Sequence, residues 1–171
     1  MRWLVDGYNV IRRSSELAAR ERESLERGRR ALIGLLSASA RDQRDQFTVV
    51  FDGAGPGGSG LGAARVRVLF SSARGSADAL LAQLARPGDA VVSSDRAVQA
   101  AARRAGAVAV SADDFLARLS ARPAGAPTAE ADKDEEQEPA RGPKKGNPRR
   151  LGKRERARQR ALGRLGRPPG P

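Results

Sequence analysis

Four aspartates stand where short apolar runs of the chain end or where a helix is expected to begin. Asp6 follows RWLV, Asp52 follows FTVVF and Asp95 follows AVVSS, while Asp78 opens the stretch ADALL that comes after ARVRVLF. Carboxylate oxygens are the ligands that hard cations such as Mg²⁺ and Mn²⁺ prefer. Acids gathered around such ions support attack of water on a phosphodiester. A single aspartate of this kind is more often a solvated turn or a helix cap, so the hypothesis depends on all four.

Residue types that the chain lacks narrow the chemistry further. Among 171 residues there is no cysteine and no histidine. This composition excludes disulfides and thiolate metal sites, and it removes the commonest general base and the commonest zinc ligand. A metal bound here must therefore be a hard cation held by oxygen, and hydrolysis must work through carboxylates and activated water.

The elements that position these acids alternate between strands and helices. Apolar runs predict strands at Arg2–Val5, Phe47–Phe51, ARVRVLF, AVVSS and AVAVS. Helical spacing and capping residues predict helices at about Ser24–Arg41, Ser76–Ala85, Arg96–Ala105 and Ala112–Leu119. Alternation at these lengths is typical of an α/β protein with a parallel sheet of about five strands between layers of helices.

A parallel sheet would bring the four acids together. The carboxyl ends of parallel strands lie at one edge of the sheet, and ligands bind in the crevice outside that edge. Asp6, Asp52 and Asp95 come at or just after strand ends, and Asp78 begins the helix after the third strand. Like charges packed together are costly unless a cation lies between them. One or two Mg²⁺ or Mn²⁺ ions are the expected cofactors.

Three further side chains are candidates for supporting roles at this edge. Asn9 is close enough to Asp6 to bind a metal water or a phosphate oxygen, although a helix cap is an equally good explanation. Ser94 stands beside Asp95 and is expected to contact phosphate or orient the acid. Gln99, one helical turn later, is expected to face the same crevice. Tyr8 either stacks on a base or packs against the sheet.

Composition divides the chain into three regions and indicates a polyanionic partner. The net charge is +12 and the pI about 11.5, which favours nucleic acid. Residues 1–121 form the expected domain, 122–140 an acidic linker rich in proline and alanine, and 141–171 a basic tail with twelve basic residues against one acidic. The linker and tail are expected to be disordered, the tail becoming helical on binding RNA. The expected RNA-binding residues of the tail are Lys144, Lys145, Arg149, Arg150, Lys153, Arg154, Arg156, Arg158 and Arg160.

No apolar run approaches the length of a membrane span, and the first residues lack the features of a secretory signal. We therefore expect a cytoplasmic protein with no membrane partner.

Several motifs together resemble the YacP-like branch of the NYN nucleases, which are relatives of the PIN-domain ribonucleases. They are LVDGYNVI, SLERGRRALIGLL, VVFDG, SADALL and SSDRAVQ, in the family's order over about residues 2–120. The resemblance implies a PIN-like three-layer fold and a Mg²⁺- or Mn²⁺-dependent endoribonuclease. It also implies Asp6, Asp52, Asp78 and Asp95 as the metal and catalytic acids, supported by Asn9, Ser94 and Gln99. Some members of this branch cut messenger RNA at the ribosome.

Two positions depart from the family's pattern. The family has a glutamate four residues after the helix aspartate, where this chain has Ala82, and its Thr-Ser-Asp is here Ser93-Ser94-Asp95. The leading hypothesis is an endoribonuclease that acts on RNA and, by resemblance, at the ribosome. The alternative is a non-catalytic RNA- or ribosome-binding protein on a nuclease-like fold. A PIN-type toxin is a third hypothesis, and DNA stays open as a substrate.

Overall fold

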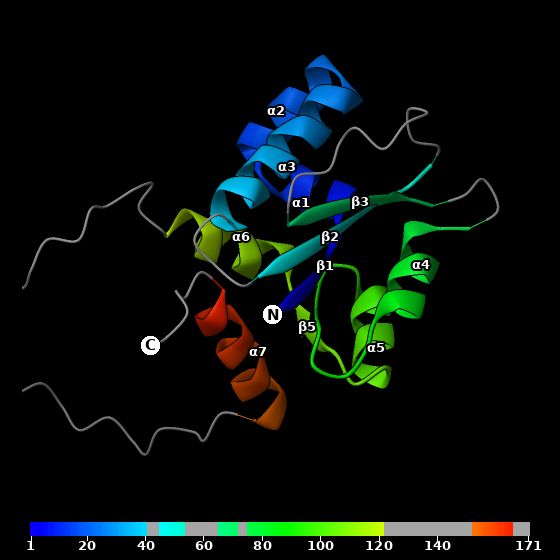
Figure 1. Cartoon of the computed structure of the whole chain (residues 1–171), viewed down its shortest axis with the longest axis vertical. Helices are drawn as coiled ribbons and strands as arrows, with labels where there is room; N and C mark the ends of the chain where they lie inside the picture. The colour runs from blue at the N-terminus through cyan, green and yellow to red at the C-terminus, as the bar shows by residue number, and fades with distance from the viewer. Residues whose placement is uncertain (41–44, 54–64, 72–74, 122–151, 166–171) are drawn as a thin grey trace, which may run out of the picture.

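The computed structural model describes residues 1–40, 45–53, 65–71, 75–121 and 152–165 (Figure 1). A five-stranded parallel sheet lies at its centre, in the order β3-β2-β1-β4-β5. The strands are β1 (Arg2–Asp6), β2 (Gln46–Phe51), β3 (Val66–Phe70), β4 (Ala90–Val92) and β5 (Val108–Val110). The helices are α1 (Gly7–Arg13), α2 (Ser15–Glu23), α3 (Leu25–Ala40), α4 (Ala77–Leu84), α5 (Arg96–Arg104), α6 (Ala112–Ser120) and α7 (Lys153–Arg164). The predicted α/β fold with five parallel strands is confirmed.

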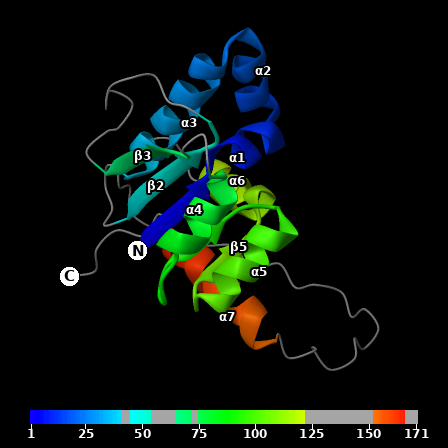
Figure 2. The same ribbon diagram turned by 90° about the vertical axis from the view of Figure 1, so that its right-hand side faces the viewer.

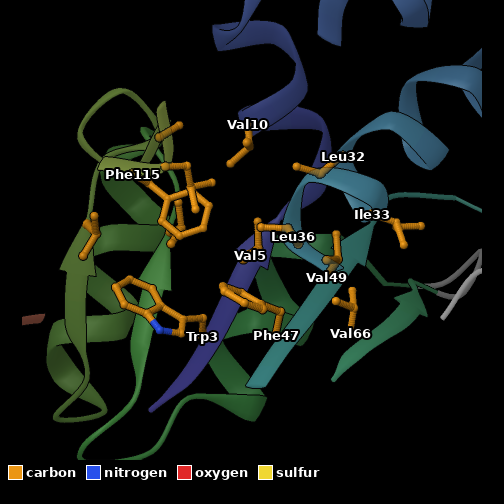
Figure 3. Packing of buried hydrophobic residues seen from close by; sticks show 14 of the residues in the cluster. Trp3, Val5, Val10, Leu32, Ile33, Leu36, Phe47, Val49, Val66 and Phe115 are labelled. Atoms are coloured by element: carbon orange, nitrogen blue, oxygen red, sulfur yellow. The ribbon is translucent and has the colours of Figure 1, made fainter. Parts of the chain in front are cut away.

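Helices cover both faces of the sheet because its strands are apolar on both sides. Alternate residues of β1 point to opposite faces, so Trp3 and Val5 pack on one side and Leu4 on the other. The larger cluster lies beneath α1, α3 and α6; Trp3, Phe47 and Phe115 form its aromatic centre, with ring centroids 5.5–6.5 Å apart (Figure 3). The smaller cluster lies beneath α4 and α5 (Figure 2). Three layers result.

The strand order makes β1 the point where the chain changes direction across the sheet. After β1 the chain builds β2 and β3 on one side, and it then builds β4 and β5 on the other. The carboxyl ends of all five strands lie at one edge because every pairing is parallel. In sheets of this kind the crevice outside the switch point is the usual ligand site.

Two helices that the sequence analysis did not predict, α1 and α2, follow β1 directly. The Asp6 carboxylate caps α1 by accepting from the Asn9 amide, and the Ser14 hydroxyl caps α2 by accepting from the Leu17 amide. Gly7 is required at the first position of α1, because a Cβ there would lie 2.3 Å from the Phe51 ring. The turn after Asp6 therefore brings α1 directly onto the end of β2.

Helix α7 corrects the expectation that no packed structure follows residue 121. Ala161 and Leu165 are 2% exposed and belong to the larger core cluster. The Arg118 guanidinium donates through Nε to the Leu162 carbonyl oxygen at 3.0 Å. The helix formed by Lys153–Arg164 thus packs beside α6 and β5 (Figure 1). The expected linker at 122–140 lies outside the described residues.

No helix in the described part of the chain is long and apolar enough to cross a membrane.

Candidate active site

The four predicted aspartates meet in one cleft at the carboxyl edge of the sheet. Its volume is about 780 Å³. Asp6 comes from the end of β1, Asp52 directly follows β2, Asp78 lies in the first turn of α4 and Asp95 precedes α5. The remaining lining residues are Tyr8, Asn9, Arg12, Arg13, Leu25, Arg29, Gly53, Ser76 and Ala77. The predicted convergence of four distant stretches of sequence is present in the structure.

The Ser93 hydroxyl links two of these acids. Ser93 is completely buried; its Oγ donates to Asp6 Oδ2 at 2.9 Å and accepts from the Asp95 amide at 3.1 Å. Asp95 in turn caps α5, with its Oδ1 accepting from the Ala97 and Val98 amides. A single buried hydroxyl therefore fixes Asp6 relative to Asp95.

Asp52 is held by a second serine on the neighbouring strand. The Ser71 hydroxyl, just after β3, donates to Asp52 Oδ1 at 2.6 Å, and the Ala77 amide donates to the same oxygen at 3.2 Å. The Ser71 hydroxyl also accepts from the Gly53 amide at 3.0 Å. Gly53 has φ +93°, a backbone conformation that glycine adopts without strain. Both the Ser71 and the Ala77 bonds hold Asp52 through its Oδ1 atom.

The electrostatics of the cleft differ from one acid to the next. Burial raises the pKa of Asp6 above its ordinary value, and the charges of Asp78 and Asp95 raise it further, against the lowering effect of Ser93 and the Asn9 amide. Burial also raises the pKa of Asp78, together with the charges of Asp95 and Asp52. The hydrogen bond from Ser71 lowers the pKa of Asp52. The acids repel one another.

No arginine or lysine in the described part of the chain lies within 4.0 Å of these four carboxylates. Within the same residues, no three acids stand close enough together to enclose one ion directly. Two of them, Asp6 and Asp95, also serve as helix caps. The four carboxylates therefore form an acidic donor set with no basic side chain within 4.0 Å among the described residues, and they are more open than a closed metal cage.

Asn9 lines the cleft, but two of the predicted supporting residues face elsewhere. Asn9 Oδ1 accepts from the Ser94 amide at 2.8 Å and so ties α1 to the end of β4. The Ser94 hydroxyl accepts from the Ala112 amide at the start of α6, so the expectation that it orients Asp95 is wrong. Gln99 donates through Nε2 to the Ser93 carbonyl oxygen and lies on the α7 side, away from the acids. Its predicted place in the crevice is also wrong.

Sequence reasoning missed Ser71 and Arg29 and gave too little weight to Ser93. A hydroxyl two residues before Asp95 was visible in the SSD motif, whereas Ser71 carried no signal beyond its place after a strand. Arg29 lies on α3, lines the cleft and is 8% exposed. Its position in a helix gave no sign that its charge is buried.

The expected RNA-binding tail separates into different groups of residues. Four of these residues are exposed side chains of α7, namely Lys153, Arg154, Arg156 and Arg160. Arg158 instead pairs with Asp114 at 2.9 Å and with Glu155 at 2.8 Å, so it joins α7 to α6. Four other residues of the prediction lie outside the described residues, namely Lys144, Lys145, Arg149 and Arg150.

Solved structures provide the first comparison. The crystal structure of Rae1 (YacP) from Bacillus subtilis is 26% identical to this chain, with a TM-score of 0.61; the match covers 71% of this chain and 74% of that one. A tryptophan-to-leucine mutant of the same Bacillus protein gives 28% identity, a TM-score of 0.57 and coverage of 71% and 75%. A search of curated proteins found no match.

The family comparison covers nearly the whole chain. The YacP-like NYN domain matches residues 3–159, a range that begins in β1, includes all four acids of the cleft and ends within α7. This range extends beyond the 2–120 on which the sequence motifs lie. The α/β fold with its five-stranded parallel sheet matches the NYN/PIN-like fold of the Bacillus protein. On this match, the chain belongs to the YacP-like NYN domain family.

Proposed function

We propose that this protein is a divalent-metal-dependent endoribonuclease that cuts RNA in the acidic cleft. The observation that supports this proposal best is the convergence of Asp6, Asp52, Asp78 and Asp95 at one edge with no cationic partner among the described residues. Membership of a nuclease family supports the same class of reaction. Perturbed acids that gather in a cleft are characteristic of functional sites.

The donor set fits Mg²⁺ or Mn²⁺, because every candidate ligand is a carboxylate or amide oxygen. Asp6, Asp52, Asp78 and Asp95 would hold one or two ions, with the Asn9 amide at the margin of the site. When bound, such ions make water a better nucleophile at neutral pH and offset the charge of the phosphodiester. No three described acids enclose one ion. Mg²⁺ usually keeps several water ligands, so ions bound in this open cleft would need only one or two carboxylates each.

The chain's own residues supply positioning and charge. Ser93 ties the Asp6 carboxylate to the Asp95 backbone amide, and Ser71 donates to the Asp52 carboxylate. A proton released by the attacking water must pass to a carboxylate or to solvent, because the chain has no histidine.

RNA is the substrate that the charge of the chain favours. The net charge is +12, and three arginines, Arg12, Arg13 and Arg29, line the cleft beside the acids. The basic residues of α7 add a second positive surface, away from the cleft. We propose messenger RNA at the cytoplasmic ribosome as the target, an assignment that rests on the family resemblance rather than on a contact in the structure.

A cleavage assay tests the proposal. The purified chain is incubated with end-labelled single-stranded RNA in Mn²⁺, in Mg²⁺ or in EDTA. We expect cutting with either metal and none in EDTA. Because a metal centre contributes several kcal/mol to the reaction, Asp6→Asn should lower the rate at least about 100-fold. The matched control is Asp113→Asn, an exposed acid that does not line the cleft, and it should cut normally. Unchanged cutting by Asp6→Asn would overturn the assignment.

The second candidate function is a non-catalytic RNA-binding protein. Two observations favour it: no three described acids enclose one ion, and Ala82 stands on α4 where the family pattern has a glutamate. This candidate predicts RNA binding that weakens with salt but no cleavage with any divalent ion. The same gel, run with and without Mn²⁺, separates the two functions.

A further inference from the structure

Arg29 is a buried guanidinium with no carboxylate partner. It is 8% exposed, and no acid of the described residues lies within 4.0 Å of it. Two other arginines that contact the fold have such partners: Arg2 pairs with Asp89 and Arg158 with Asp114. Since an arginine stays charged at any physiological pH, burial without a counter-ion is costly. Something else must stabilise this charge.

Aromatic rings provide part of that stabilisation. The guanidinium carbon of Arg29 lies 5.4 Å from the centroid of Tyr8, 5.5 Å from Phe51 and 5.0 Å from Phe70. A cation over ring faces is attracted by the ring quadrupoles. Tyr8 is fixed in turn by an edge contact with Phe51, with their centroids 5.1 Å apart. The rings hold the guanidinium in place but accept few of its hydrogen bonds.

The hydrogen bonds of Arg29 are only partly used. Its Nε donates to the Tyr8 hydroxyl oxygen at 2.9 Å, and its Nη2 donates to the same oxygen. A guanidinium has five N–H donors in one plane, and no other acceptor for Arg29 is found among the described residues. The side chain lines the cleft that contains the four aspartates. A pre-positioned fork of donors therefore borders the acidic cleft.

The cleft thus has a cationic part beside its acids. Arg12 and Arg13 also line it, but both are exposed and each lies 3.6 Å from a carboxylate of its own, on Glu21 and on Asp113. Arg29 differs from them because it is buried and has no acid within that reach among the described residues. A planar guanidinium matches two oxygens of a phosphate group, and a charge-assisted bond of this kind is strong in a partly desolvated place.

We propose that Arg29, held by Tyr8, binds a backbone phosphate of the single-stranded RNA whose neighbouring phosphodiester lies at the acids. This inference rests on the proposed function and deepens it, because it assigns an anchor for the strand. Tyr8 is the positioning residue. Its hydroxyl accepts from Nε and Nη2 of Arg29, and its ring lies 5.4 Å from the guanidinium carbon. Tyr8 then serves neither as a base-stacking platform nor as packing alone.

The test measures binding rather than cleavage. The full chain, in EDTA, is titrated into a labelled five-nucleotide RNA and followed by fluorescence anisotropy at several salt concentrations. Arg29→Met keeps an apolar side chain in the ring cage and removes the charge. We expect affinity to fall about tenfold and the slope of log K against log salt to flatten by about 0.7, the value for one lost phosphate contact on a single strand.

The matched control is Arg30→Met, the next residue of α3. Arg30 is exposed, pairs with Glu26 at 2.5 Å and does not line the acidic cleft. This variant removes the same charge from the same helix, so its affinity should stay within about twofold of wild type with an unchanged slope. Equal binding and slope for wild type and a folded Arg29→Met protein would overturn the inference and leave Arg29 a structural residue.

A second variant decides the matter if Arg29→Met fails to fold. Arg29→Lys keeps the charge but loses the planar fork, and it should weaken binding roughly three- to tenfold; binding equal to wild type would contradict the proposal. Failure of the proposed function looks different. If the protein never cuts RNA but Arg29→Met lowers its RNA affinity, the phosphate anchor is supported and the nuclease assignment is wrong. If the protein cuts RNA but Arg29→Met binds RNA as tightly as the wild type, the nuclease assignment is supported and the phosphate anchor is wrong.

Discussion

The two edges of the sheet carry buried aspartates with opposite surroundings. At the amino edge, Asp45 and Asp89 precede β2 and β4 and are 4% and 6% exposed. Asp89 accepts from Nε and Nη2 of Arg2 at 2.9 and 2.5 Å, and Asp45 accepts from the Met1 amino group at 3.0 Å. At the carboxyl edge, Asp6 is 8% exposed and accepts from the Ser93 hydroxyl and the Asn9 amide. No basic side chain of the described residues lies within 4.0 Å of its carboxylate.

This difference separates structural acids from functional ones within a single sheet. Asp45 and Asp89 each have a cationic partner within the chain, and breaking such a buried pair destabilises a fold. At the carboxyl edge, burial and the charges of neighbouring acids raise the pKa values of Asp6 and Asp78, so their charged forms are held at a cost. On the proposed function, a divalent cation bound between these carboxylates would compensate for this cost. Substitutions at the two edges should therefore have different consequences.

Removing the hydroxyl that joins two acids should damage activity without altering either acid. Ser93→Ala should lower the metal affinity or the cleavage rate about 10–100-fold, since residues that orient metal ligands have effects of this size. Ser94→Ala is the control, because its hydroxyl accepts from the Ala112 amide at the start of α6 and bonds to none of the four acids, while its amide still reaches Asn9. Steady-state cleavage rates at varied Mn²⁺ measure both. An equal loss in the two variants would contradict the role given to Ser93.

Neutralising an aspartate of the amino edge should destabilise the fold. Asp89→Asn removes the charge that receives two bonds from Arg2 and one from the Arg86 amide. We expect a loss of about 1.5–3 kcal/mol, the range for hydrogen bonds to charged groups. The lower half is expected because the Arg2 side chain is 40% exposed and solvent screens the pair. Urea unfolding measures the change as a lower midpoint at constant slope.

At the carboxyl edge, by contrast, the same kind of substitution should stabilise the metal-free protein. Asp6→Asn removes a buried charge that faces Asp78 and Asp95 while an oxygen remains to accept from the Asn9 amide. We expect a gain of about 0.5–2 kcal/mol in EDTA at neutral pH, the usual range when an unfavourable functional feature is relieved. Urea unfolding in EDTA is again the measurement. If both aspartates destabilise on substitution, the contrast between the edges is wrong.

The stabilisation by Asp6→Asn should depend on pH with a definite sign. The folded pKa of Asp6 is raised above its ordinary value of 3.8, so between these two values the folded state binds more protons than the unfolded state. The stability of the wild type therefore falls as pH rises through this window. The advantage of Asp6→Asn in EDTA should be small near the ordinary value, grow through the window and level off above the folded pKa. A constant advantage would exclude titration of Asp6 as its cause.

The sequence was sufficient for the sheet and for the convergence of the four acids. Each strand that carries one of them was an apolar run that ended near an acid, and parallel topology alone brings such ends together. Helix α1 was not predicted because it is only seven residues long, and α2 was not predicted because Leu17 is its single buried residue. Helix α7 was taken for tail because it packs through little more than Ala161 and Leu165.

Side-chain direction was harder to predict than position. Gln99 points away from the acids because Val98 and Ala102 set the rotation of α5 against the sheet. The burial of Arg29 could not be predicted from the sequence, because the rings that surround its guanidinium come from three separate elements. They are Tyr8, Phe51 and Phe70. Such features depend on tertiary packing, which neither hydrophobic period nor motif spacing records.

Binding of Mn²⁺ to the two kinds of aspartate variant tests the central claim most directly. Free Mn²⁺ is followed by electron paramagnetic resonance as it is titrated into wild type, Asp6→Asn and Asp89→Asn, with thermal unfolding of the same samples. Wild type and Asp89→Asn should bind the ion, and at about 100 times Kd it should stabilise each by about 2.7 kcal/mol. Asp6→Asn should bind far more weakly and gain little. Equal Mn²⁺ binding by Asp6→Asn and wild type, or none by either, would contradict a metal site at the carboxyl edge.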